Sequence, residues 1–242
     1  MSGRPEGMPA SFVNAMTTIE AAHPIWIIAG AGVLALLLVL YRPTWRIART
    51  AVTIVHEGGH ALVAVLVGRR LDGIRLHSDT SGVAISRGRP TGPGVVATAA
   101  AGYPMPSLVG LGCAALLGAD MVTGMLWVGV ALLAATLVMV RNWYGAFAVL
   151  VTGLLLAGVA YLAPTVVQAA FAYLIAWFLL LGGVRPVSEL QARRSRHHSP
   201  DSDADQLGRL TGLPGGLWVV VFGLVNVACL VFGGGWLLHL SV

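Results

Sequence analysis

Residues 51–67 read AVTIVHEGGHALVAVLV, a stretch in which a polar motif is embedded in a run that suits a lipid environment. The motif consists of His56, Glu57 and His60. Side chains at positions i and i+4 of a helix share one face, so the two imidazoles can bind the same metal ion. Glu57 is then a candidate general base beside that metal. Ionisable groups at membrane depth are costly to retain without a function, which favours a metal site over a chance pattern.

The composition of the whole chain indicates an integral membrane protein. Hydrophobic residues make up 57% of the 242 residues and charged residues only 10%, whereas a soluble domain carries about 25% charged residues. The mean hydropathy is +0.81. No basic stripe is interleaved with aromatic residues, so we expect the lipid bilayer as a partner and no nucleic acid. Cys113 and Cys229 lie far apart in apolar stretches and are expected to be packing residues.

Apolar runs of about 20 residues predict an all-α bundle of six to seven transmembrane helices. We expect a single membrane-embedded domain over residues 1–242, with a polar N-terminal tail at 1–23 and a hydrophilic loop at 184–215. The tail has no positively charged cluster and no cleavage-site pattern, so a cleaved signal peptide is not expected. The candidate apolar segments are 24–41, 47–67, 95–117, 121–140, 143–162, 165–183 and 217–240.

Two polar connections have predictable local structure. Residues 68–94, after the second apolar segment, contain two short runs in which apolar and polar residues alternate around a turn-like stretch. This alternation predicts a short β-hairpin directly after the HExxH helix. The apolar positions of the predicted hairpin are Ile74, Leu76, Val83 and Ile85. In the 184–215 region we expect a solvated loop followed by a short helix capped by Ser202.

The arginines predict an orientation, because cytoplasmic loops of membrane proteins carry an excess of positive charge. The arginines within residues 69–89 and 185–209 are expected on the cytoplasmic side, together with the N-terminus. Arg42, Arg46 and Arg49, between the first two segments, would then lie outside. Either this short connection is an exception to the rule, or one of the segments is re-entrant.

An HExxH motif in a membrane helix, followed by a hairpin region, a glycine-rich span and a late aspartate, resembles the site-2-protease class of intramembrane zinc metallopeptidases. The resemblance is to the compact branch of this class found in actinobacteria, and it covers Thr50 to Trp236. It implies a zinc cofactor, a membrane-anchored protein substrate and a location in the plasma membrane. Further family-like strings are AGYP at 101–104, RNWYG at 141–145 and SDADQL at 202–207.

The third metal ligand is the least defined part of the predicted site. A catalytic zinc takes three protein ligands and a water, and the resemblance implies that the third ligand is an aspartate, for which we favour Asp203. The class carries this aspartate in an Asn-Pro-Asp-Gly or Leu-Asp-Gly context, and this chain contains neither. A solvated acidic patch or a helix cap is the structural alternative. The remaining candidate ligands are Asp205, Asp201, Asp120 and the loop histidines His197 and His198.

Asn142 is a second candidate catalytic residue. It follows Arg141 at the boundary of an apolar segment, where the arginine most simply anchors the helix at the interface. In the resembled class an asparagine steadies the carbonyl of the substrate, and an amide donor aimed at a developing oxyanion is what such a reaction needs.

The resulting prediction is a zinc metallopeptidase that uses Glu57 as its base and receives a locally unwound substrate, which can add as a strand to the hairpin edge. The alternative is a metal-binding membrane protein without proteolytic activity: a catalytically silent relative, an assembly factor or a transporter. A transporter should carry several intramembrane acidic or histidine residues on different spans, and Glu57 is nearly the only carboxylate at depth. A structural bundle with a chance motif is the third possibility. The sequence identifies neither the substrate nor the oligomeric state.

Overall fold

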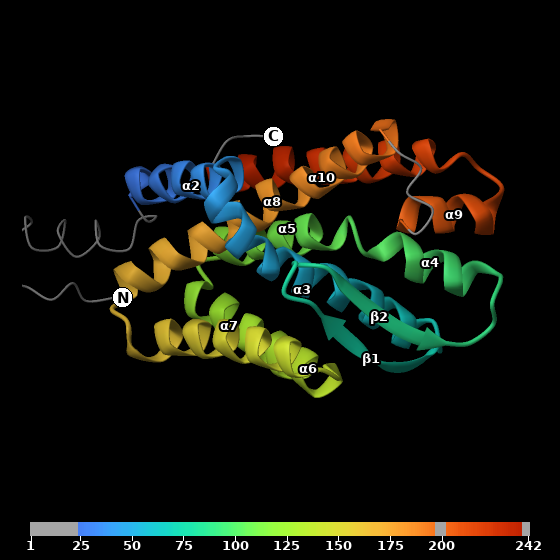
Figure 1. Cartoon of the computed structure of the whole chain (residues 1–242). Coiled ribbons are helices and arrows are strands. Elements are labelled where there is room, and N and C mark those ends of the chain that lie inside the picture. Colours follow the sequence, from blue (N-terminus) through green and yellow to red (C-terminus); the bar gives the residue numbers. More distant parts are fainter. Residues whose placement is uncertain (1–23, 197–201, 239–242) are drawn as a thin grey trace, which may run out of the picture.

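The computed structural model describes residues 24–196 and 202–238, which form a helical bundle with one small hairpin (Figure 1). The predicted N-terminal tail lies outside the described residues. In Figure 1 the helix that carries the HExxH motif runs through the middle, with α6 and α7 on one side and α8 and α10 on the other. The elements are α2 (Ile25–Leu40), α3 (Arg42–Leu66), β1 (Arg70–Leu76), β2 (Gly82–Arg87), α4 (Pro93–Ala101), α5 (Met105–Gly118), α6 (Val122–Met139), α7 (Trp143–Leu162), α8 (Thr165–Arg196), α9 (Asp203–Thr211) and α10 (Gly215–Leu237).

The described helices confirm an all-α, multi-pass membrane architecture with four to six candidate spans. Four helices, α6, α7, α8 and α10, are each long and apolar enough to cross a bilayer, and up to six spans result if two bent pairs each count as one. The first two predicted segments are the arms of one such pair, α2 and α3, which meet at 102°. The third predicted segment is itself broken into α4 and α5 at 70°. Among the described residues the upper limit is therefore six spans, because the first two predicted segments together count as at most one span.

Proline explains why both pairs are bent. Pro43 stands in the first turn of α3, and Pro104 and Pro106 flank the start of α5. A proline lacks the N–H that continues a helix and clashes with the preceding turn, so the incoming helix ends before it. A count of apolar residues does not register such breaks. The bend lies beside Arg42, so α2 and α3 form either one broken span or a re-entrant loop, and the orientation of the bundle stays a prediction.

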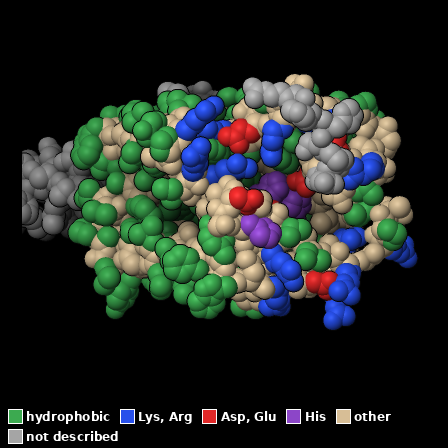
Figure 2. All heavy atoms as spheres, in the orientation of Figure 1, with side chains coloured by type: hydrophobic (Ala, Val, Ile, Leu, Met, Phe, Trp, Pro, Cys, Tyr) green, Lys and Arg blue, Asp and Glu red, His purple; other side chains and the backbone are tan. Residues whose placement is uncertain are grey.

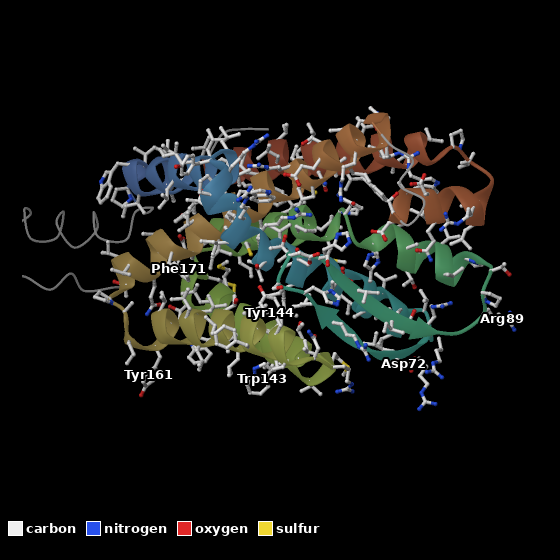
Figure 3. The ribbon with its side chains drawn as sticks, in the orientation of Figure 1. Asp72, Arg89, Trp143, Tyr144, Tyr161 and Phe171 are labelled. Carbon is white, nitrogen blue, oxygen red and sulfur yellow. The ribbon has the colours of Figure 1, made fainter. Side chains whose placement is uncertain are left out.

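The dimensions of α7 match a bilayer. Its 20 residues give a length of about 30 Å at about 1.5 Å per residue, the thickness of the hydrocarbon core. Trp143 and Tyr161 lie near opposite ends of this helix and point outward (Figure 3). Their exposed fractions are 87% and 79%. Aromatic residues with this placement are typical of the two membrane–water interfaces.

The predicted hairpin is confirmed as an antiparallel pair of strands in which Ile74 lies opposite Ala84 and Leu76 opposite Gly82. Ile74 and Leu76 are buried against α3 and α7. The strand β1 has a second neighbour, because the N–H of Arg141 donates to the carbonyl of Ile74 at 2.8 Å. The hairpin is thus fixed between the HExxH helix and the start of α7.

The hydrophilic region differs in part from the expectation. Residues 185–196, which we expected to begin a loop, continue α8 to Arg196. They are held there because Glu189 accepts hydrogen bonds from Trp45 (3.1 Å) and Arg185 (2.9 Å). The short helix that we expected after the loop is confirmed as α9, and the side chain of Ser202 accepts the N–H of Asp205 at its N-terminus. A buried cluster from α4, α8, α9 and α10 holds α9 on the bundle.

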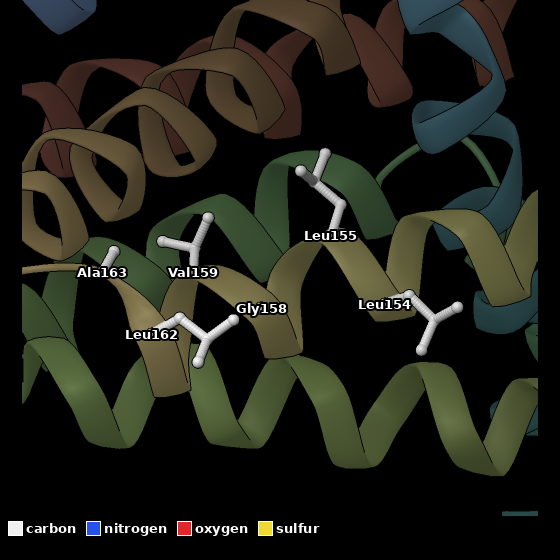
Figure 4. A pocket seen from close by; sticks show the side chains of 6 residues that line it. All are labelled: Leu154, Leu155, Gly158, Val159, Leu162 and Ala163. Atoms are coloured by element: carbon white, nitrogen blue, oxygen red, sulfur yellow. The ribbon is translucent and has the colours of Figure 1, made fainter.

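An apolar groove of about 340 Å³ lies along α7 (Figure 4). Leucine, valine, alanine and glycine line it, and none of these side chains offers a polar atom. The groove therefore suits hydrocarbon and contains none of the predicted site residues. Its lining residues are Leu154, Leu155, Gly158, Val159, Leu162 and Ala163.

Candidate metal site

Helix α3 presents two imidazoles side by side. The Nε2 atoms of His56 and His60 lie 3.2 Å apart, as expected for positions i and i+4 of a helix. The Nδ1 atom of His60 lies 2.7 Å from the carbonyl oxygen of Thr98 on α4. Because a carbonyl only accepts hydrogen bonds, Nδ1 carries the proton, and Nε2 of the neutral ring keeps a free lone pair. This is the tautomer that a metal ligand needs.

The first turn of α9 brings a carboxylate to the same point. Oδ2 of Asp203 lies 3.2 Å from Nε2 of His56 and 3.2 Å from Nε2 of His60. The three side chains are 19%, 20% and 11% exposed, in the order Asp203, His56, His60. Among the described residues, these three side chains lie close enough together to hold one metal ion.

The spacing of these atoms fits a tetrahedral zinc ion. Zinc binds nitrogen and carboxylate oxygen at about 2.0–2.1 Å, so two ligand atoms of a tetrahedral site stand about 3.3–3.4 Å apart. All three separations among the atoms of His56, His60 and Asp203 are 3.2 Å. The number of protein ligands in this triangle is the number that a catalytic zinc site would use.

The charge state of Asp203 also suits a cation. Burial by itself would raise the pKa of this carboxyl, but the two imidazoles beside it lower the pKa below its ordinary value. Its Oδ2 atom is buried and makes no well-formed hydrogen bond within the described residues. A buried acceptor without such a bond is costly, and a metal ion would satisfy it.

Two features fix Asp203 in place. Ser202 caps α9, so Asp203 begins the helix with its backbone already ordered. Asp205, two residues further on, forms an ion pair with Arg194 of α8 and accepts a hydrogen bond from Ser202 at 2.6 Å. Burial of Ala204 between them anchors the same turn in the core. The first turn of α9 therefore lies against the HExxH helix, held by the Ser202 cap and by the ion pair between Asp205 and Arg194.

Glu57 lies between the two histidines in sequence and is 5% exposed. Its carboxylate faces the start of β2, where a Cβ atom on Gly82 would stand 2.6 Å from Cγ of Glu57. The acid is thus enclosed between the HExxH helix and the hairpin.

Gly102 and Tyr103, at the break between α4 and α5, form a wall of the site that the sequence reasoning did not identify. A Cβ atom on Gly102 would stand 2.6 Å from Cε1 of His60 and 2.7 Å from Cε1 of His56. The Tyr103 ring meets the His56 ring edge-on with the centroids 4.9 Å apart. The available signal in the string AGYP was a glycine two residues before a proline.

The other predicted site residues lie apart from the triangle. Asn142 caps the start of α7, and its amide pairs with the backbone of Leu76: Nδ2 donates to the carbonyl at 2.6 Å and Oδ1 accepts the N–H at 3.1 Å. Asp205 is engaged with Arg194, and Asp120 lies in the turn after α5. The candidates His197, His198 and Asp201 fall outside the described residues.

The surface around the site is polar, whereas the rest of the visible face is apolar. In Figure 2 histidine side chains are visible near the middle of the face, with acidic and basic side chains around them. The surface over α2, α6 and α7 is covered mostly by hydrophobic side chains.

Comparison with known proteins gives one match. The model of the family described as Peptidase M50B-like matches residues 29–233, a range that contains all three residues of the triangle. No curated protein and no solved structure gave a significant match.

Proposed function

The chain belongs to the Peptidase M50B-like family, and from this premise we propose that it is an intramembrane zinc endopeptidase that hydrolyses peptide bonds of membrane-anchored protein substrates. Metallopeptidases of this broader family depend on zinc in general. The observation that carries the proposal is the triangle of ligand atoms with 3.2 Å sides. Glu57, the residue after His56, provides the carboxylic acid that such an enzyme requires as its general base.

In this proposal Nε2 of His56, Nε2 of His60 and Oδ2 of Asp203 hold the zinc ion. When bound, zinc supplies Lewis-acid chemistry: it polarises a carbonyl oxygen and lowers the pKa of a coordinated water to about 7. Glu57 accepts a proton on its carboxylate as the peptide bond is attacked and returns it to the leaving amine. Its enclosure beneath β2 restricts access of bulk water to this proton.

The hairpin is the proposed receiving surface for the substrate. A transmembrane helix hides its amide groups in its own hydrogen bonds, so a substrate must unwind before cleavage. In the described part of the chain β2 pairs only with β1, which leaves its outer edge open to an extended segment. The strand begins at Gly82, next to Glu57, so a peptide along this edge passes the proposed base.

The edge hypothesis can be tested with proline. Successive N–H groups of a strand point to opposite edges. Proline has no N–H, so one of the two variants Ala84→Pro and Ile85→Pro removes a hydrogen bond within the hairpin. The other variant removes a hydrogen-bond donor from the open edge. Cleavage should fall for both variants while the zinc content stays at the wild-type level. Unchanged cleavage in both would contradict strand addition.

Asn142 is proposed to assist the substrate carbonyl. The amide nitrogen carries two hydrogens, and donation to Leu76 uses one of them. The other is the proposed donor to a developing oxyanion, a contact whose removal costs about 10²–10³ in rate in other enzymes. Asn142→Ala should lower cleavage by that order with zinc retained, and an unchanged rate would remove the residue from the catalytic set.

The decisive experiment uses the purified chain in liposomes with a single-span model substrate whose span contains glycine and proline. We expect wild type to cut it, zinc chelation to stop the reaction and zinc to restore it. Glu57→Gln should retain the metal and lose about 10²–10⁴ in rate. Zinc binding without cleavage that depends on Glu57 would instead favour the non-proteolytic metal-binding alternative.

A further inference from the structure

Asn226 is a buried amide in the middle of an apolar membrane helix. It lies in α10, a 23-residue helix with a mean hydropathy of 2.3 over its best window, and its exposed fraction is 0%. A polar group in this position is costly unless it is bonded, and such groups in membrane spans mark functional positions. No part of the proposed chemistry uses this residue.

The amide nitrogen of Asn226 joins two other helices. Nδ2 donates to the carbonyl oxygen of Gly183 at 2.9 Å and to that of Tyr103 at 3.2 Å. Tyr103 stands at the break before α5, where no regular helix continues to use its carbonyl. Gly183 lies just before Pro186, which loosens the preceding turn of α8. Asn226 therefore supplies donors to two carbonyls, one at the break between α4 and α5 and one in the turn of α8 that precedes Pro186.

Gly183 is also a point of close approach between α5 and α8. A Cβ atom there would collide with Oγ of Ser107 on α5 and stand 3.0 Å from its backbone nitrogen. The bond from Asn226 thus acts where three helices meet. The Oδ1 atom of Asn226 has no hydrogen-bond partner within the described residues. The amide therefore links the helices only through the two hydrogen bonds that its nitrogen donates.

The residue held by Asn226 touches a candidate metal ligand. The Tyr103 ring meets His56 edge-on and stacks on Phe222 of α10, with centroids 5.3 Å apart and planes 20° apart. The preceding Gly102 is in contact with both imidazoles. Movement of the Tyr103 backbone would therefore move the wall against which His56 and His60 are oriented.

We propose that Asn226 is a positioning residue for the metal site: its amide fixes the Gly102–Tyr103 break and so holds the two histidine rings in the geometry that binds zinc. The proposal rests on the metal-binding part of the proposed function. It assigns a role at the site to α10, which contributes no ligand. The residue acts through Tyr103 and touches neither the metal nor the substrate.

The chain provides a matched control in Gln168. This residue of α8 is also a buried amide, 8% exposed, and its Nε2 donates to the carbonyls of Ala160 and Ala163 at 3.2 and 3.0 Å. Those carbonyls belong to the end of α7, away from the histidines. Loss of Gln168 should therefore cost stability without disturbing the metal site.

The experiment compares wild type, Asn226→Leu and Gln168→Leu in detergent. Zinc affinity is measured by competition with a chromophoric chelator, and the Co²⁺-loaded proteins are compared by visible absorption, which reports the geometry around the metal. We expect Asn226→Leu to bind zinc about tenfold more weakly or worse, the loss typical of residues that orient ligands, and to change the Co²⁺ spectrum. Gln168→Leu should match wild type in both measurements.

If Asn226→Leu does not fold, Asn226→Ser and Gln168→Ser provide the same comparison, because serine keeps one donor and is tolerated in membrane helices. Wild-type affinity and spectrum in the Asn226 variant would overturn the positioning role while leaving the metal site intact. Equal weakening in the Asn226 and Gln168 variants would also overturn it, since the effect would then be general destabilisation. A wild-type protein that binds no zinc would contradict the proposed function itself.

Discussion

Oδ2 of Asp203 on α9 and Nε2 of His60 on α3 lie 3.2 Å apart, although a hairpin and five helices separate them in the chain. His56 stands at the same distance from the same oxygen. Three polar atoms of this kind, converging where the bundle is otherwise apolar, need a cation or a proton between them. The relationship explains why α9 is capped, paired and packed against the bundle.

Gly102→Ala should abolish metal binding. The backbone of Gly102 is αR, which alanine adopts without strain, but the new methyl would press against both imidazoles. We expect the zinc content of the purified protein to fall to background while the helical content by circular dichroism stays the same. Gly112→Ala is the control, because its Cβ would meet nothing within 4 Å. A zinc content in Gly102→Ala equal to that of the control would contradict the close contact.

The two glycines of the HEGGH motif should respond differently to alanine. A Cβ atom on Gly59 would stand 2.7 Å from Cβ of Met105, whereas one on Gly58 would meet nothing within 4 Å. Gly59→Ala should force α3 and α5 apart and lower the free energy of unfolding by about 1–3 kcal/mol. Gly58→Ala should raise it by about 0.5–1 kcal/mol, because alanine favours the helix more than glycine does and the new methyl has space. Thermal unfolding in detergent distinguishes the variants, and equal midpoints would show that the two helices are not in close contact here.

The ion pair between Arg194 and Asp205 should contribute to zinc affinity although neither residue touches the triangle. It ties α9 to the end of α8, and the two side chains are each 21% exposed. Arg194→Ala should weaken zinc binding about fivefold, which corresponds to about 1 kcal/mol. Arg193→Ala removes a neighbouring exposed arginine and should leave the affinity unchanged. If the two variants bind zinc equally, the pair does not hold Asp203 in place.

Local patterns predicted the elements of the fold well. Alternation around residues 79–82 predicted the hairpin, and Ser202 predicted the start of α9. The resemblance further favoured Asp203, which the structure brings beside the two histidines of the motif. The hairpin, the start of α9 and the histidine motif can each be recognised from a short stretch of sequence, through periodicity, a capping residue or residue spacing.

The parts that sequence reasoning missed depend on contacts between distant segments. Apolar runs gave no sign of the 102° and 70° bends, because proline changes direction without changing hydropathy. Helix α8 continues to Arg196 because Glu189 finds partners on α3 and α8. Gly102 and Asn226 were not identified because their importance lies in what they touch. The loop histidines His197 and His198 remain outside the described residues.

The most direct test of the central claim is the zinc content of the detergent-purified chain by elemental analysis. We compare wild type with His56→Ala, Glu57→Gln, Asp203→Asn and, as the matched control, Asp120→Asn. The account predicts one zinc per wild-type chain, retained in Glu57→Gln and Asp120→Asn and lost in His56→Ala and Asp203→Asn. Wild type without zinc, or full zinc content in Asp203→Asn, would contradict the claim that the triangle binds the metal.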